Sequence, residues 1–236
     1  MSNANEIWEE IKRFSVEPAQ DASVGCFELS ELLSLVKERM NAQAPHIAAS
    51  LYMRHAAFIF VGRLFALSKY RVKWTGELRR IGLADRTIEG RWAPLWTFAD
   101  GDWAATRSDR EVAEALQAIV CGDARKLVQT LAGYTNSSQA VLWENIWGYV
   151  LWMYVQLMQE PGECAERARS DLQLLLDKSV WEGVERKSPF TRFLGDQTPE
   201  AAMAAYKRVT CCFYYEVPGF QKCSYCPTLK TDEVSP

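Results

Sequence analysis

Four of the seven cysteines of this chain lie within sixteen residues near its C-terminal end. They form the vicinal pair Cys211-Cys212 and, after ten residues, the pair Cys223 and Cys226. So dense a group of cysteines is typical of a metal site or of disulfide bonds, and either one dictates how this part of the chain folds. The two interpretations predict different proteins, because one supplies a metal or redox centre and the other a covalent staple.

The size and composition of the chain argue against disulfide bonds. With 236 residues, 48% of them hydrophobic, the chain can build a core that needs no disulfide. Residues 1–14 lack the apolar run of a secretory signal, so we expect a cytoplasmic protein whose thiols stay reduced. The net charge of −3 gives no bias towards nucleic acid, and no nucleic-acid partner is expected.

The longest apolar stretch, 141–158, is the candidate for a membrane-spanning helix. It contains Glu144, Asn145 and Gln156, which favours a buried helix over a membrane span. We therefore expect at most a transient association with a membrane.

The spacing of the four cysteines favours a two-iron cluster over zinc. Zinc ribbons mostly use two Cys-x-x-Cys turns, and here only Cys223 and Cys226 have that form. The side chains of a vicinal pair such as Cys211-Cys212 diverge in most backbone conformations, which suits a target with two metal centres. Residues 186–230 also hold seven Lys or Arg against three Asp or Glu, and this positive excess suits an anionic cluster. On these residues alone, a [2Fe-2S] cluster ranks first, structural zinc second and disulfides third, and all three stay open.

The remaining pattern predicts an α+β fold with a mainly helical body. We expect a small antiparallel sheet around 70–106, with Asp100-Gly101 as a hairpin turn between two Trp-containing runs. Apolar spacing, caps and glycine or proline stops predict the helices. They cover 27–40, 45–67, 108–122, 123–132, 137–161, 163–178 and 198–208. We expect two parts, a mainly helical body over 1–187 and a cysteine-bearing C-terminal segment over 188–236.

The C-terminal pattern resembles that of the FhuF-like ferric-siderophore reductases. The match is Arg208-Val-Thr-Cys211-Cys212 followed by Cys223-Ser-Tyr-Cys226-Pro227, and the stretches 46–70 and 142–145 are compatible with it. The resemblance implies a [2Fe-2S] cluster held by all four cysteines. It also implies an oxidoreductase of iron transport that reduces imported Fe(III)-siderophore in the cytoplasm, with an electron donor that the sequence does not identify.

One-electron reduction of Fe(III) to Fe(II) weakens the hold of hard anionic oxygen ligands, so this reaction needs no nucleophile or proton-transfer group. His46 and His55 lie nine residues apart and do not predict a metal site. Basic residues are the candidates for binding a ferric siderophore. They are Arg54 and Arg63 on the second helix, and Lys207, Arg208 and Lys222 beside the cysteines.

Other side chains are assigned mainly to the core. Trp143, Trp147 and Trp152 recur at near-helical spacing, which indicates packing more than a ligand pocket. The isolated Cys26, Cys121 and Cys164 are expected to be buried small hydrophobic side chains.

Two other functions fit the cysteine pattern. The first is a siderophore-binding module with structural zinc, and the second is a ferredoxin-like electron-transfer protein. A body of more than 180 residues ahead of the cysteines argues against a pure carrier.

Overall fold

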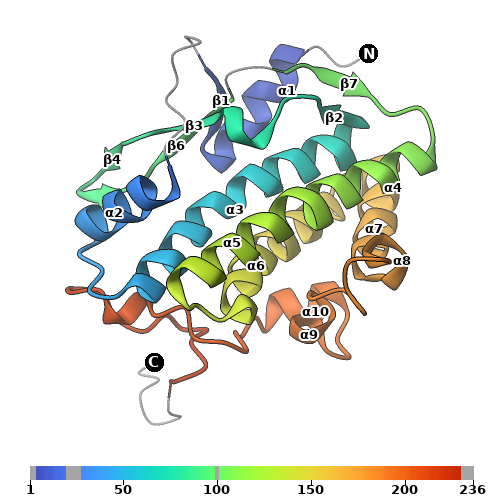
Figure 1. Ribbon diagram of the computed structural model, residues 1–236. Coiled ribbons are helices and arrows are strands. Elements are labelled where there is room, and N and C mark those ends of the chain that lie inside the picture. The colour runs from blue at the N-terminus through green and yellow to red at the C-terminus, as the bar shows by residue number, and fades with distance from the viewer. Residues whose placement is uncertain (1–3, 20–27, 99–100, 230–236) are drawn as a thin grey trace.

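A long helix, α3 (Pro45–Tyr70), runs through the middle of the molecule (Figure 1). This computed structural model describes residues 4–19, 28–98 and 101–229. Pro45 stands at the first turn of α3, where its missing N–H costs no hydrogen bond, and Arg71 ends the helix in the left-handed conformation. Most of the residues of α3 are buried on all sides, as expected for a helix inside a bundle.

The other helices pack around α3. The most extensive neighbour is α6 (Gln139–Leu157), which is also buried over most of its surface. Around this pair lie α1 (Ala4–Ile11), α2 (Leu29–Met40), α4 (Asp109–Gln117), α5 (Arg125–Thr135), α7 (Glu163–Leu176) and α8 (Lys178–Trp181). The helices α9 (Thr191–Leu194) and α10 (Pro199–Ala204) lead into the cysteine segment.

Three predicted helix ends are wrong. The chain does not stop at Gly122 but passes from α4 through a π-helical turn, η3 (Ala118–Ala124), directly into α5. Gly122 does not adopt a positive φ, so its backbone continues the helix. Gly133 likewise lies inside α5, and Asn136, in the left-handed conformation, ends that helix instead. The last predicted helix ends at Ala204, short of residue 208.

The predicted helix starts at Ser108 and Thr198 are confirmed. The Ser108 hydroxyl accepts a hydrogen bond from the Glu111 N–H, and the Thr198 hydroxyl accepts one from the Ala201 N–H. These caps give α4 and α10 defined beginnings.

The strands form small sheets above one face of the bundle (Figure 1). The antiparallel pairings predicted around 70–106 are present. They join β3 (Ile81–Ala84) to β6 (Leu95–Phe98), β2 (Val72–Trp74) to β7 (Trp103–Ala105), and β4 (Thr87–Ile88) to β5 (Arg91–Trp92). A further strand, β1 (Val16–Pro18), pairs in parallel with β6 and was not predicted. Short 3-10 turns, η1 (Lys12–Phe14) and η2 (Leu78–Arg80), complete this region.

The two strands on either side of Asp100-Gly101 do not pair with each other, so the predicted hairpin is wrong. Asp100 lies outside the described residues, but β6 and β7 on either side belong to different sheets. A Cβ built on Gly101 would lie 2.3 Å from the Gly76 backbone nitrogen, so the chain crosses close over Gly76. This close approach lets β7 run beside β2 instead of returning beside β6.

The α+β class with a mainly helical body is confirmed. An aromatic cluster of Trp143, Trp147, Trp181 and Phe190 lies in the core, with ring centroids 5.3–5.8 Å apart. Ser188 is buried and donates to the Leu175 carbonyl at 2.8 Å. The division of the chain at residue 188 stays a prediction. Within the described residues, no helix is both long and apolar enough to cross a membrane.

Candidate iron–sulfur site

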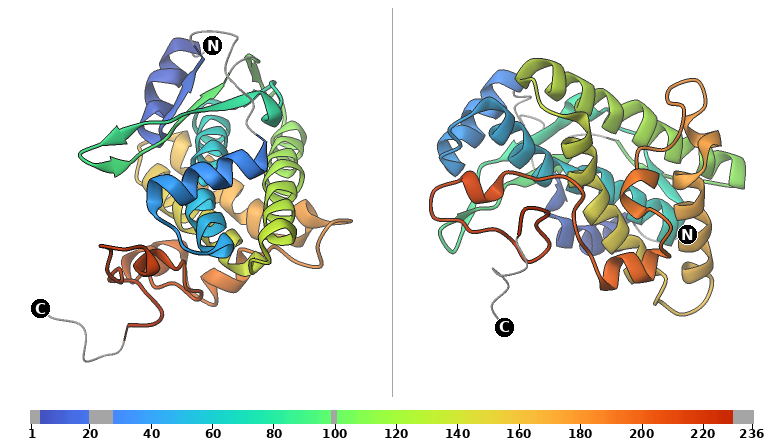
Figure 2. Two further views of the ribbon diagram at one scale, coloured as in Figure 1. Left: turned by 60° about the vertical axis from the view of Figure 1, so that its left-hand side comes forward. Right: turned by 90° about the horizontal axis from the view of Figure 1, so that it is seen from below.

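The cysteine segment, residues 205–229, crosses the bundle on the side away from the sheets (Figures 1 and 2). Its one short helical turn is η4 (Tyr214–Glu216), and the rest is held by side chains of the bundle. Seen from below in Figure 2, the segment runs over the lower ends of the helices. The bundle therefore positions the cysteines through specific contacts and not through regular structure of the segment itself.

Glu144 of α6 anchors the segment just before Cys211. Its carboxylate accepts hydrogen bonds from the backbone N–H of Val209 at 2.6 Å and of Thr210 at 2.7 Å, and from the Thr210 hydroxyl. Glu144 is 1% exposed, and its charge faces the guanidinium of Arg208 at 3.4 Å. Hydrogen bonds to a charged acceptor are among the stronger ones, so this carboxylate fixes where the cysteines begin.

A second anchor holds Cys212 itself. The Ser50 hydroxyl of α3 donates to the Cys212 carbonyl at 2.8 Å, and the Asn145 amide nitrogen donates to both the carbonyl and the hydroxyl of Ser50 at 2.9 Å. The adjacent residues Glu144 and Asn145 thus tie α6, α3 and the cysteine segment into one buried network. Two of the three polar residues that argued against a membrane span thus hold the segment.

The four thiols gather in this segment. Cys212 and Cys226 are buried, and Cys211 and Cys223 are half-buried. The Cys223 thiol donates to Cys212, and this hydrogen bond, with the charges of Arg54 and Arg208, lowers the pKa of Cys212 to about 5. The same interaction raises the pKa of Cys223. The geometry therefore favours a thiolate at Cys212, which is the form that ligates metals.

Further donors surround the sulfurs. The Phe213 N–H donates to Cys211 Sγ at 3.3 Å, and the Thr228 hydroxyl lies 3.2 Å from Cys226 Sγ. Phe213 adopts φ 60°, in the left-handed region. Donors to cysteine sulfurs are one of the means by which a protein sets the potential of an iron–sulfur cluster.

Two arginines add positive charge on the buried side. Arg54 of α3 donates from Nη1 to Cys212 Sγ at 3.4 Å and lies over the Tyr214 ring at 5.0 Å. Arg208 is buried and binds the Thr210 carbonyl through Nε and the Tyr225 carbonyl through its backbone N–H. Of the three predicted arginines, Arg54 therefore contacts the cysteine segment and Arg208 lies within it.

Of the other predicted basic residues, Arg63 lies away from the cysteine segment. Arg63 lies nine residues beyond Arg54 on α3, about 13 Å away in helical rise. It forms an ion pair with Asp123 and lies over the Trp74 ring. Lys207 is exposed, and Lys222 donates to the Thr228 carbonyl and lies over the Tyr215 ring. Arg63 is thus held on another part of α3, while Lys207 and Lys222 remain beside the cysteines.

A cavity of about 330 Å³ adjoins the segment. Arg54, Arg208 and Tyr225 belong both to its wall and to the surroundings of the cysteines. The other lining residues come from η1, α3, α6 and α10 and the chain that follows it; they are Arg13, Phe58, Asn145, Gly148, Tyr149, Trp152, Met203 and Tyr206. Trp152 is the one tryptophan of the predicted trio in this wall, whereas Trp143 and Trp147 are in the core.

Apart from Arg54 and Arg208, the cavity residues were not predicted as substrate-binding, and neither was Glu144. Tyr149 and Tyr206 look like core aromatics in the sequence, and only the folded chain brings them together at Tyr225. Glu144 and Asn145 did give a signal, since two polar residues side by side in a strongly apolar helix need buried partners.

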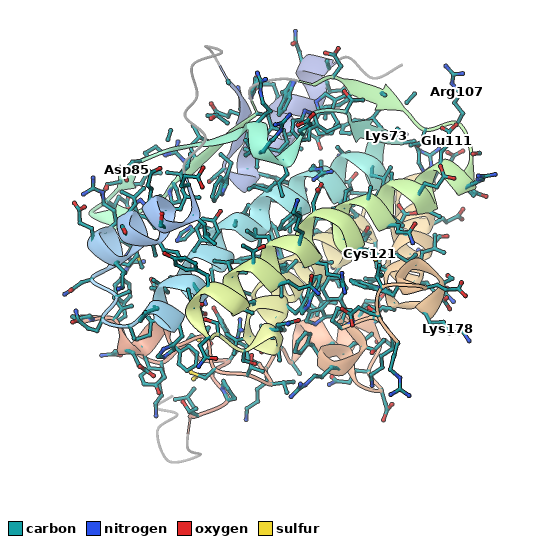
Figure 3. The ribbon with its side chains drawn as sticks, viewed as in Figure 1. Lys73, Asp85, Arg107, Glu111, Cys121 and Lys178 are labelled. Atoms are coloured by element: carbon teal, nitrogen blue, oxygen red, sulfur yellow. The ribbon has the colours of Figure 1, made fainter. Side chains whose placement is uncertain are left out.

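The isolated cysteines lie apart from this segment. Cys121, labelled in Figure 3, is buried and donates to the Val180 carbonyl at 3.1 Å, as expected for a structural thiol. Cys164 is only half-buried, which corrects the expectation for that residue, because the N-terminal part of α7 lies near the surface. Cys26 lies outside the described residues.

The donor set fits a [2Fe-2S] cluster. Four cysteine thiols, one of them already favoured as thiolate, supply the ligands that such a cluster takes. Cationic Arg54 and Arg208 balance the negative charge that four thiolates bring.

Comparison with known families decides the type of centre. Residues 208–227 match the family model described as the FhuF 2Fe-2S C-terminal domain. Residues 208–227 are therefore similar to the FhuF 2Fe-2S C-terminal domain. The comparison with curated proteins found no match. The match spans Arg208 and the four cysteines, and it supports a [2Fe-2S] cluster as the cofactor of this FhuF-like segment.

Proposed function

We propose that the protein is a ferric-siderophore reductase that passes one electron to Fe(III)-siderophore and releases Fe(II). The observation that supports this most is the cavity beside the cysteines, because Arg54 both lines it and contacts Cys212 Sγ. Cys211, Cys212, Cys223 and Cys226 would hold the cluster, which supplies single electrons when bound. A redox centre with a ligand cavity at its side suits reduction of a bound substrate better than simple electron carriage.

The substrate is an iron complex that loses stability on reduction. Siderophores bind Fe(III) through hard anionic oxygens, and these hold the larger, softer Fe(II) far less well. The electron is therefore the release step, and the chain needs to bind, orient and shield the complex. Arg13, Arg54 and Arg208 line the cavity and would attract the negative charge of such a complex.

Aromatic side chains would exclude water around the cysteines. The rings of Tyr214 and Phe220 lie 4.5 Å apart, and those of Tyr206 and Tyr225 lie 5.5 Å apart. Tyr225 stands between Cys223 and Cys226 in the chain and reaches the cavity. A dry boundary lowers the local dielectric and strengthens the effect of the arginine charges.

A cavity of about 330 Å³ lies at the small end of ligand sites, which run from about 300 to 1,000 Å³. It would admit one part of a siderophore while the iron stays near the mouth. We place the reaction in the cytoplasm, with an electron donor whose identity is open.

Anaerobic single-turnover mixing tests the proposed function. The protein is reduced chemically, freed of excess reductant, and mixed with ferric complexes of the hydroxamate, catecholate and carboxylate classes in the presence of an Fe(II) chelator. We expect the cluster absorbance to change to that of the oxidised form as chelated Fe(II) appears. A cluster that stays reduced with every class would favour a carrier that serves another reductase. Cys212→Ser protein treated in the same way controls for reduction by residual reagent.

A further inference from the structure

Tyr225 links the turn at 223–226 to the rest of the molecule. Its carbonyl accepts a hydrogen bond from the Arg208 N–H at 3.0 Å, and its hydroxyl interacts with the Arg54 guanidinium. Arg54 in turn donates to Cys212 Sγ at 3.4 Å. Tyr225 therefore connects the second pair of cysteines, between which it stands, to the first pair.

Tyr206 packs against Tyr225. The two ring centroids lie 5.5 Å apart and the rings are inclined by 60°. Such an inclined contact is favourable for two aromatic rings. Both rings line the cavity, and both belong to the segment that carries the cysteines. The pair thus forms the part of the cavity wall that is next to the turn at 223–226.

Gly148 of α6 makes room for Tyr206. A Cβ at position 148 would lie 2.6 Å from Tyr206 Oη and 3.3 Å from Cζ, and real Cβ atoms do not approach within 3.0 Å of another heavy atom. The Tyr206 hydroxyl is buried and has no hydrogen-bond partner in the described part of the chain, so packing places this ring. Glycine inside a helix costs stability relative to alanine, and the close approach of Tyr206 gives a reason for it here.

We propose that Tyr206 and Tyr225 are positioning residues for the iron–sulfur cluster, and that Gly148 is the surface against which they are placed. Contact with Gly148 fixes Tyr206, Tyr206 fixes Tyr225, and Tyr225 fixes where the turn at 223–226 presents its sulfurs beside the cavity. Glu144, one turn earlier on α6, holds the chain ahead of the first pair of cysteines. The inference rests on the proposed function only in taking the cavity as the substrate site.

Three variants isolate the contact between Gly148 and Tyr206. Gly148→Ala brings a Cβ against the hydroxyl and displaces the ring. Tyr206→Phe keeps the ring and removes only the hydroxyl. In the double variant the nearest ring atom is Cζ at 3.3 Å, and a shift of a few tenths of an ångström relieves that contact. Gly133→Ala is the matched control, because Gly133 also lies inside a helix but has nothing within 4 Å of its built Cβ.

The EPR spectrum of the reduced protein and the rate of iron loss to a chelator measure the placement of the cluster. We expect an altered spectrum and iron loss faster by about fivefold or more in Gly148→Ala. Tyr206→Phe and Gly133→Ala should match the wild type in both measurements. The double variant should return to about the wild-type values, because the clash that disturbs Gly148→Ala is with the hydroxyl.

The outcomes that would overturn the inference are equally specific. They are wild-type values in Gly148→Ala, a double variant as disturbed as Gly148→Ala, and an altered spectrum in Tyr206→Phe alone. Should Gly148→Ala not fold, a folded double variant with the wild-type spectrum supports the inference, and failure of both to fold overturns it.

The link through Tyr225 has its own test. Tyr225→Leu removes the ring, and we expect an altered spectrum and faster iron loss. Tyr215→Leu is the control, because Tyr215 also lies beside the cysteines but its ring faces Lys222. Equal rates of iron loss in the two variants would overturn the positioning role of Tyr225.

None of these measurements uses a ferric siderophore, so their failure leaves the reductase proposal standing. Conversely, a protein that gives all the expected spectra and reduces no ferric siderophore would overturn the reductase proposal alone.

Discussion

The Nη1 atom of Arg54 lies 3.4 Å from the Sγ atom of Cys212, although 158 residues separate the two in the chain. Arg54 sits in the second half of the third turn of α3 and also lines the cavity. One guanidinium thus faces a predicted cluster ligand on one side and the proposed substrate site on the other. Its charge favours whichever state of the centre is more negative.

Replacing Arg54 should lower the reduction potential. Reduction adds one negative charge, and a cation this close to a ligand sulfur stabilises the reduced form. We expect Arg54→Met to shift the potential down by tens of millivolts in an EPR-monitored redox titration and Arg54→Lys to shift it less. Arg110→Met is the control, because Arg110 is an exposed arginine paired with Glu114. An Arg54→Met potential equal to that of the wild type would show that the guanidinium does not act on the centre.

Replacing Glu144 should loosen the cysteine segment. Glu144→Gln removes the charge that accepts hydrogen bonds from Val209 and Thr210, and we expect a loss of about 2–3 kcal/mol in the free energy of unfolding with faster loss of iron to a chelator. Asp171→Asn is a matched control, because Asp171 is a buried carboxylate bound to Ser68 and Arg71 away from the cysteines. The control should lose stability without faster iron loss. Equal rates of iron loss in the two variants would contradict a positioning role for Glu144.

Replacing one cysteine of the vicinal pair tests whether both act as ligands. Cys212→Ser should abolish or shift the absorption and EPR spectra of the centre, because an oxygen ligand or an empty position replaces the thiolate. Cys121→Ser should leave the spectra unchanged, since Cys121 is bound to the Val180 carbonyl in another part of the bundle (Figure 3). A Cys212→Ser spectrum identical to that of the wild type would make Cys212 a neighbour and not a ligand.

His55 should make stability depend on pH. Burial, together with the charge of Arg54, lowers the pKa of His55 to about 4, whereas an unfolded histidine has a pKa near 6.5. Below pH 6.5 His55 binds a proton in the unfolded chain but stays neutral in the folded chain. The free energy of unfolding therefore falls as the pH drops towards 4. Between pH 7.0 and 5.5 this contributes about 1 kcal/mol.

Urea unfolding of wild type and His55→Phe at both pH values isolates the effect. Phe keeps a ring against Trp92, which lies 4.8 Å from the His55 ring. The loss of stability on acidification should be smaller in His55→Phe, and an equal loss in both proteins would rule out His55 as its source.

The features that could be predicted from the sequence are those set by local pattern. The caps at Ser108 and Thr198 are set within four residues. The cysteine spacing favours a [2Fe-2S] cluster without any knowledge of the body, and the family match over 208–227 supports it. The helix end at Gly122 was predicted wrongly because a glycine with open space around it can lie inside a helix. Tertiary packing determines that the helix continues through Gly122, since η3 contacts α3, α4 and α5.

The features that could not be predicted depend on contacts between distant residues. Arg54 and Arg63 are equivalent in the sequence, yet one contacts Cys212 and the other pairs with Asp123, because they lie at different heights on α3. The cavity arises where α3, α6 and the segment after α10 meet, and no single stretch contains its polar atoms. The parallel pairing of β1 with β6 joins residues 16–18 to 96–98 and has no local signal.

The most direct test of the reductase claim is to count electrons and iron in one experiment. Anaerobically reduced protein is mixed, in separate runs, with one equivalent of a ferric hydroxamate, catecholate or carboxylate siderophore and an Fe(II) chelator, and samples frozen at successive times are examined by EPR. The account predicts that the signal of the reduced cluster disappears as chelated Fe(II) appears, with one Fe(II) for each cluster oxidised. A signal that persists while the ferric complex remains intact would contradict it.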